Sequence, residues 1–130
     1  MAQTDNASPA GKKRILIVED EHPLAHALEL KLSHEGIETT VASTGSEGLT
    51  QALSGKYDLI LLDLILPGLD GFALLSEMKA KGIKTPVIVL SNLGQDEDKR
   101  KAKEGGAVDY LVKSNSPLAD ILILVKKIVS

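Results

Sequence analysis

Five short apolar runs alternate with segments of helical periodicity along the chain, and this alternation restricts the possible folds more than any other feature. After the first run, Leu24, Ala27, Leu28 and Leu32 repeat at the spacing of an amphipathic helix, whereas the segment at about 95–104 is predicted as a polar helix. Strands that alternate with helices through short connections form a parallel sheet with helices on both faces. We therefore predict an α/β fold with a doubly wound parallel sheet. Its strands are predicted at residues 14–20, 37–42, 58–66, 86–91 and 107–112.

The chain of 130 residues suits a single domain with its own core. We predict a disordered tail over residues 1–13, which are mostly small and polar, and one folded domain over residues 14–130. The tail has no apolar segment of the signal-peptide kind, and no apolar run reaches the roughly 18 residues that span a bilayer. The sequence also has no cysteine. These features predict a cytoplasmic protein that does not contact a membrane.

Charge and aromatic content argue against direct binding of nucleic acid. The net charge is −3, whereas binding to a phosphate backbone requires a basic face. Aromatic residues make up only 2% of the chain, so no stacking surface for single-stranded bases is expected.

Polar residues stand where four of the predicted strands end. Because the carboxyl ends of parallel strands meet at one edge of the sheet, we expect these side chains to lie close together. Neighbouring carboxylates repel one another and require a cation. Lys113 supplies one positive charge, and a hard divalent ion such as Mg²⁺ with oxygen ligands would supply more. The converging residues are Glu19, Asp20, Asp63, Ser91 and Lys113.

Asp63 interrupts the aliphatic run DLILLDLIL, where a charge without a partner would be costly. A carboxylate beside a divalent metal can act as a nucleophile toward a phosphoryl group. We therefore interpret Asp63 as a phosphoryl acceptor. The structural alternatives are that Glu19 and Asp20 are acids favoured at a helix N-terminus, and that Ser91 caps a helix. The expected convergence of these residues on one edge favours a functional site.

Four motifs in order resemble the receiver domain of bacterial two-component response regulators. The resemblance extends from Arg14 to Val129, and is strongest to single-domain regulators of the chemotaxis and sporulation kind. It implies that residues 14–130 form a receiver domain with a flavodoxin-like fold and strand order 2-1-3-4-5. The motifs are ILIVEDE (15–21), LLDLILPGLDG (61–71), PVIVLSN (86–92) and GAVDYLVKS (106–114).

The resemblance also implies roles for individual residues. Asp63 would accept a phosphoryl group from a histidine kinase, and Ser91 and Lys113 would contact that group. Tyr110 would be the aromatic switch residue, turning inward when Ser91 moves. The domain would catalyse only its own phosphorylation and dephosphorylation, and so would not be an enzyme in the ordinary sense.

The cofactor implied by the resemblance is Mg²⁺. Asp20, Asp63 and the backbone carbonyl of Ile65 would bind the ion directly. Glu19 would act through a metal-bound water.

The predicted output is a change in the surface formed by the fourth helix (about 95–104), the fifth strand and the last helix (about 117–129). The last helix is unusually apolar, which predicts an exposed patch for a downstream partner protein or a homodimer. The sequence leaves open a stand-alone receiver or a piece of a longer protein. It also leaves open a pseudo-receiver that binds partners without phosphorylation. An aspartyl-nucleophile phosphatase is disfavoured, because such enzymes carry a second acid where Ile65 stands.

Two departures from the family pattern lie near the predicted site. Ser114 follows Lys113 in place of proline, and Asn92 replaces a small residue beside the acceptor. Apolar Ile65 and Leu93 occupy positions whose side chains tune hydrolysis in the family. Because apolar side chains cannot orient a water molecule, we predict slow self-dephosphorylation.

Overall fold

The computed structural model describes residues 12–130, so the predicted disordered tail lies outside the described residues except for Lys12 and Lys13. Five strands form one parallel sheet in the order β2-β1-β3-β4-β5, which confirms the predicted doubly wound, flavodoxin-like fold. The strands are β1 (Arg14–Val18), β2 (Glu38–Ala42), β3 (Leu59–Leu62), β4 (Val87–Ser91) and β5 (Asp109–Val112). The α-helices are α1 (His22–His34), α2 (Gly45–Ser54), α3 (Gly71–Ala80), α4 (Asp96–Glu104) and α5 (Leu118–Val129).

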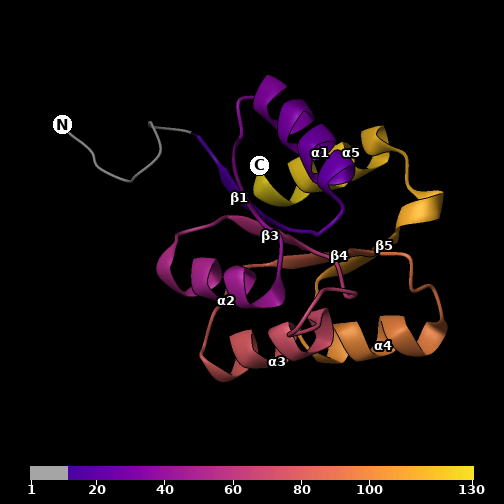
Figure 1. Ribbon diagram of the computed structural model, residues 1–130. Helices are drawn as coiled ribbons and strands as arrows, with labels where there is room; N and C mark the ends of the chain where they lie inside the picture. Colours follow the sequence, from indigo (N-terminus) through magenta and orange to yellow (C-terminus); the bar gives the residue numbers. More distant parts are fainter. Residues whose placement is uncertain (1–11) are drawn as a thin grey trace.

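The helices cover both faces of the sheet, with α1 and α5 on one side and α2, α3 and α4 on the other (Figure 1). Successive residues of a strand point to opposite faces, so β3 contributes to two separate cores. Leu59 and Leu61 pack in the α1–α5 core, whereas Ile60 and Leu62 pack in the core beneath α2, α3 and α4. Each fully buried side chain of this size stabilises the fold by roughly 1.5–3 kcal/mol.

The three central strands are nearly continuous apolar runs because both of their faces are covered. The third strand is shorter than the predicted range 58–66, because the chain leaves the sheet after Leu62. The residues that follow form the β3–α3 loop, which passes through Gly68 at φ +74°. Such a φ strongly favours glycine. The loop therefore begins with Asp63, directly above the sheet edge.

The start of α3 holds the β3–α3 loop in place. The Asp70 carboxylate caps the helix by accepting a hydrogen bond from the Ala73 N–H at 2.9 Å. The Gly71 N–H donates to the Leu64 carbonyl at 2.9 Å. A Cβ at Gly71 would lie 2.4 Å from the Leu64 Cα and 2.6 Å from the Asp63 carbonyl oxygen. Glycine is therefore required for this close approach of α3 to the residues that follow β3.

No helix within residues 12–130 combines the length and apolar character needed to cross a membrane.

Candidate functional site

The carboxyl edge of the sheet brings together four of the five residues that the sequence predicted there, namely Glu19, Asp20, Asp63 and Lys113. Glu19 follows β1, Asp63 follows β3 and Lys113 follows β5. The Lys113 Nζ lies 2.9 Å from the Asp63 Oδ2 and 3.0 Å from the Glu19 Oε2. A hollow of about 180 Å³ opens over this cluster. Its lining residues are Asp20, Glu21, Asp63, Ile65, Asn92 and Lys113.

The central carboxylates are buried and share one cation. Glu19 is 2% exposed and Asp63 is 5% exposed, so neither is well solvated. Lys113 also lies 3.5 Å from the Glu21 Oε1, which makes Glu21 a third carboxylate around the same ammonium. Glu21 occupies the N-cap of α1 and was not among the residues predicted to converge at this edge. The one sequence feature that pointed to the contact of Glu21 with Lys113 was its position directly after Asp20.

Burial raises the pKa of Glu19 to about 7. The hydrogen bond from the Glu21 N–H and the Lys113 ammonium act in the opposite direction, while the nearby Asp63 charge adds to the rise. Burial alone would lower the pKa of Lys113, but its hydrogen bonds to Asp63 and Glu19 outweigh burial and raise it. Lys113 therefore stays charged at neutral pH, whereas Glu19 titrates there.

Three carboxylates are arranged so that they can hold a metal ion. Glu19, Asp20 and Asp63 each offer an oxygen, and these oxygens lie within 4.8 Å of one another. An all-oxygen, anionic donor set fits a hard divalent cation such as Mg²⁺. Ile65 lines the same hollow, and its N–H donates to the Asp63 Oδ1 at 3.1 Å. This hydrogen bond orients the Asp63 carboxylate from the β3–α3 loop.

Ser91 and Tyr110 are connected through the backbone of one residue, Leu93. Ser91 is fully buried, and its Oγ accepts a hydrogen bond from the Leu93 N–H at 3.4 Å. The Leu93 carbonyl in turn accepts a hydrogen bond from the Tyr110 hydroxyl. The alternative interpretation of Ser91 as a helix cap is wrong, because α4 is capped at Gln95.

Burial raises the pKa of Tyr110 to about 12, and the charges of Asp98 and Asp63 add to the effect. The Tyr110 hydroxyl therefore keeps its proton at neutral pH and remains the donor in this bond. Tyr110 thus contacts the β4–α4 loop at its hydroxyl end.

The loop after Lys113 differs from the family pattern in sequence and forms a short 3₁₀ turn over Lys113–Asn115. No peptide bond within residues 12–130 is cis, so the Lys113–Ser114 bond is trans.

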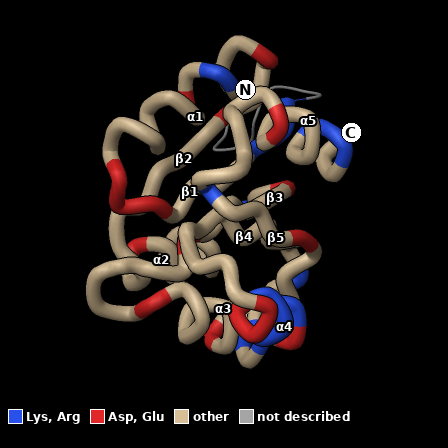
Figure 2. The backbone as a smooth tube through the Cα atoms, turned by 90° about the vertical axis from the view of Figure 1, so that its right-hand side faces the viewer, with Lys and Arg blue, Asp and Glu red and all other residues tan. Residues whose placement is uncertain are grey.

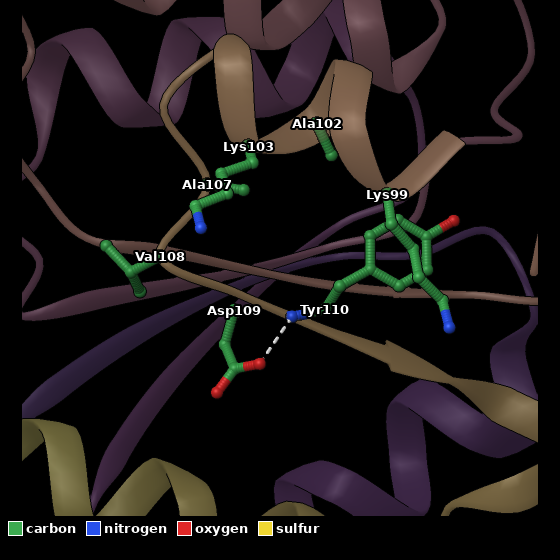
Figure 3. A pocket seen from close by; sticks show the side chains of 7 residues that line it. All are labelled: Lys99, Ala102, Lys103, Ala107, Val108, Asp109 and Tyr110. Carbon is green, nitrogen blue, oxygen red and sulfur yellow. Dashed lines mark hydrogen bonds between the residues drawn. The ribbon is translucent and has the colours of Figure 1, made fainter. Parts of the chain in front are cut away.

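A second hollow, of about 190 Å³, lies between α4 and β5. Figure 3 shows Lys99 and Lys103 approaching it from α4 and Tyr110 from β5, with the Asp109 carboxylate hydrogen-bonded to the Tyr110 N–H. Figure 2 shows that α4 carries many basic and acidic residues close together. On α5, Ile123 is 66% exposed, whereas the other large apolar residues of that helix are buried or half-buried.

Comparison with known proteins agrees with this geometry. The family model described as "Response regulator receiver domain" matches residues 15–125. The uncharacterized transcriptional regulatory protein YkoG of Bacillus subtilis is 43% identical over 102 residues, which are 78% of this chain and 45% of that protein. The chain thus spans less than half the length of the curated relatives that it matches.

Solved structures show the same likeness. The receiver domain of Francisella response regulator 1452 superposes with a TM-score of 0.84 at 35% identity, covering 89% of this chain and 95% of that one. The BeF3-activated N-terminal receiver domain of RstA from Klebsiella pneumoniae superposes with a TM-score of 0.83 at 27% identity, covering 90% and 98%.

Proposed function

This chain belongs to the response regulator receiver domain family, and from that premise we propose that Asp63 accepts a phosphoryl group from a histidine kinase. The observation that carries the proposal is the position of the Asp63 carboxylate. It is 5% exposed, lies 2.9 Å from the Lys113 ammonium and belongs to a three-carboxylate cluster that suits a metal. A receiver domain is a signalling domain rather than an ordinary enzyme, and the phosphorylated aspartate would be its signal.

In the proposed reaction an Asp63 carboxylate oxygen attacks the phosphorus of a phosphohistidine. A P–O bond forms, the P–N bond breaks, and the electron pair leaves with the imidazole, which is protonated. Mg²⁺ held by Asp20, Asp63 and the Ile65 carbonyl, with Glu19 reaching it through water, would neutralise phosphoryl charge when bound. The Ile65 N–H donates to the Asp63 Oδ1, and the Lys113 ammonium donates to the Asp63 Oδ2. Together these two hydrogen bonds fix the orientation of the Asp63 carboxylate.

Phosphorylation adds a charge of about −1.5 to −2 and three acceptor oxygens beside Lys113 and Ser91. We propose that the Ser91 hydroxyl then turns toward the phosphoryl group, which changes its hydrogen bond with the Leu93 N–H. Because the Leu93 carbonyl accepts from Tyr110, movement of this loop would also move the switch residue Tyr110. This hydrogen-bonded path supports Ser91 and Tyr110 as the switch pair.

The proposed output surface comprises α4, β5 and α5. It contains the hollow that Tyr110 and Lys99 line and the exposed Ile123 on α5. We propose that a downstream protein, or a second copy of the chain, binds this surface in a phosphorylation-dependent way. Light scattering at high concentration, with and without beryllofluoride, would test the dimer, and a monomer under both conditions would exclude it.

We also propose that the phosphoryl group is lost slowly. Ile65 lies 55% exposed at the hollow, and neither Ile65 nor Leu93 has a polar side chain to orient a water molecule. The decay of phosphorylated protein after removal of the donor measures this directly, and a half-life of seconds would contradict the proposal.

The central test is intact-mass measurement after incubation with acetyl phosphate and Mg²⁺. The wild-type protein should gain one phosphoryl group, and the Asp63→Asn variant should gain none. A gain in both proteins would move the acceptor to another residue. No gain in the wild type, with acetyl phosphate or with a histidine kinase, would favour the pseudo-receiver alternative. Steady release of phosphate from a phosphate ester would favour a phosphatase instead.

A further inference from the structure

Asn92 lines the same hollow as Asp63 and Lys113, and its side chain is exposed at that hollow. No hydrogen-bond partner of its side-chain amide occurs among residues 12–130. An amide NH₂ group carries two donors, both of which are free here. Asn92 immediately follows buried Ser91, so its backbone position is fixed by the end of β4.

The charged donor at the site, the Lys113 ammonium, is already engaged. Lys113 has three N–H groups, and it contacts the three carboxylates of Glu19, Asp63 and Glu21 at 2.9–3.5 Å. A phosphoryl group on Asp63 would bring three further acceptor oxygens into the hollow. Lys113 cannot serve all of these oxygens while it holds its carboxylate partners. The Ser91 hydroxyl is proposed above to donate to one of these oxygens, and among the side chains that line the hollow the Asn92 amide is the further uncommitted donor.

We infer that the Asn92 side-chain amide donates a hydrogen bond to the phosphoryl group on Asp63 and is a further binding residue for it. This inference rests on the proposed function and adds to it a residue role specific to this chain. A neutral donor is suited to the position, because it binds the phosphoryl oxygens without adding a second cation to compete for Glu19 and Asp63. It also leaves the metal-binding carboxylates untouched.

The bulk of Asn92 offers a rival explanation, in which the side chain only restricts access to Asp63. Asn92→Leu separates the two, because leucine has nearly the same size and no donor. Asn92→Ala removes both the size and the donor. Under the inference both variants lose affinity for the phosphoryl group, whereas under the rival Asn92→Leu resembles the wild type and Asn92→Ala binds at least as well.

The test uses beryllofluoride as the phosphoryl probe at fixed, saturating Mg²⁺, with the dissociation constant measured by calorimetry. Loss of one hydrogen bond at an exposed position should weaken binding about 3- to 10-fold in both Asn92→Leu and Asn92→Ala. Affinity for Mg²⁺ alone should stay within about twofold, which also shows that each variant is folded. Asn115→Leu is the matched control, since Asn115 is exposed on the neighbouring turn and does not line the hollow. It should bind like the wild type.

Two results would overturn the inference. Unchanged or tighter beryllofluoride binding by Asn92→Leu or Asn92→Ala, with wild-type protein binding normally, would reject the role of Asn92 alone. Failure of the wild-type protein to bind beryllofluoride in the presence of Mg²⁺ would reject the proposed phosphoryl site, and the Asn92 role with it.

Discussion

Replacing Lys113 with methionine would remove the one ammonium group within 4 Å of both Glu19 and Asp63 among residues 12–130. Methionine approximates the length of the lysine side chain and keeps most of its apolar contacts, so the main change is the loss of charge. Both carboxylates would stay buried, at 2% and 5% exposure. We predict a large loss of stability for the metal-free protein.

The size of the loss can be estimated in two ways. Carboxylate oxygens of Glu19 and Asp63 lie within 4.8 Å of each other, and at an effective dielectric constant of about 20 two such charges repel by roughly 3 kcal/mol. Removing one partner of a buried ion pair typically costs about 3–5 kcal/mol. Because the site opens onto a hollow, we expect the lower figure, about 3 kcal/mol, which corresponds to a fall in the melting temperature of about 10 °C.

Urea unfolding followed by circular dichroism, without metal, measures this loss of stability. The pH should be about 8, because that lies above the raised pKa of Glu19, about 7. Saturating Mg²⁺ should restore more stability to the variant than to the wild type, because it supplies the missing positive charge. Lys126→Met is the matched control. Its ion pair with Glu35 is short, at 2.7 Å, but both side chains are exposed, so its loss should cost less than about 1 kcal/mol.

The reasoning would be refuted if Lys113→Met were as stable as Lys126→Met without metal. It would also be refuted if Mg²⁺ stabilised Lys113→Met no more than the wild type. Either result would mean that the carboxylates do not depend on Lys113 for charge balance.

Three further predictions concern the loops and the titration of the site. Gly71→Ala should lower the free energy of unfolding by about 1–3 kcal/mol, because the new Cβ would crowd the Asp63 carbonyl; urea unfolding measures it, and a neutral result would contradict the packing. Burial raises the pKa of Glu19 from 4.5 to about 7, so its contribution to stability is present below pH 4.5 and lost as pH rises through about 7. Mg²⁺ competes with that proton, so calorimetry should show tighter Mg²⁺ binding at about pH 8 than at about pH 6, and equal affinities would exclude this competition. Tyr110→Phe removes the hydroxyl bond to the Leu93 carbonyl and should lower stability by about 1 kcal/mol in thermal melts while beryllofluoride binding persists; loss of that binding would place Tyr110 in the site itself.

The fold was largely predictable because the central strands are apolar on both faces. A run such as LILL, at 59–62, can satisfy both cores only inside a parallel sheet with helices on each side. The end of the third strand was not predictable from hydrophobicity, since Leu64 and Leu66 continue the apolar pattern beyond it. Both residues are buried, but they pack from the loop rather than from the sheet.

Site residues were predictable where a charged side chain stands in an apolar segment that offers it no structural role. Asp63 inside an aliphatic run has few structural explanations, and it does lie beside Lys113. The contact of Glu21 with Lys113 was missed, because it depends on the direction in which the chain enters α1. The link from Ser91 to Tyr110 through the Leu93 backbone was also missed, because every residue has the same peptide group and no side-chain pattern marks it.

The relay from Ser91 to Tyr110 uses the backbone of Leu93, whereas the proposed lifetime of the phosphorylated state depends on the Leu93 side chain. Both hydrogen bonds of Leu93 use its peptide N–H and C=O, so they would persist whichever amino acid other than proline stood at this position. Evolution could therefore exchange the side chain at position 93 to lengthen or shorten the proposed phosphorylated state without cutting the path to Tyr110. A family of regulators sharing this arrangement could diverge in the duration of its response while the means of relaying it stayed constant.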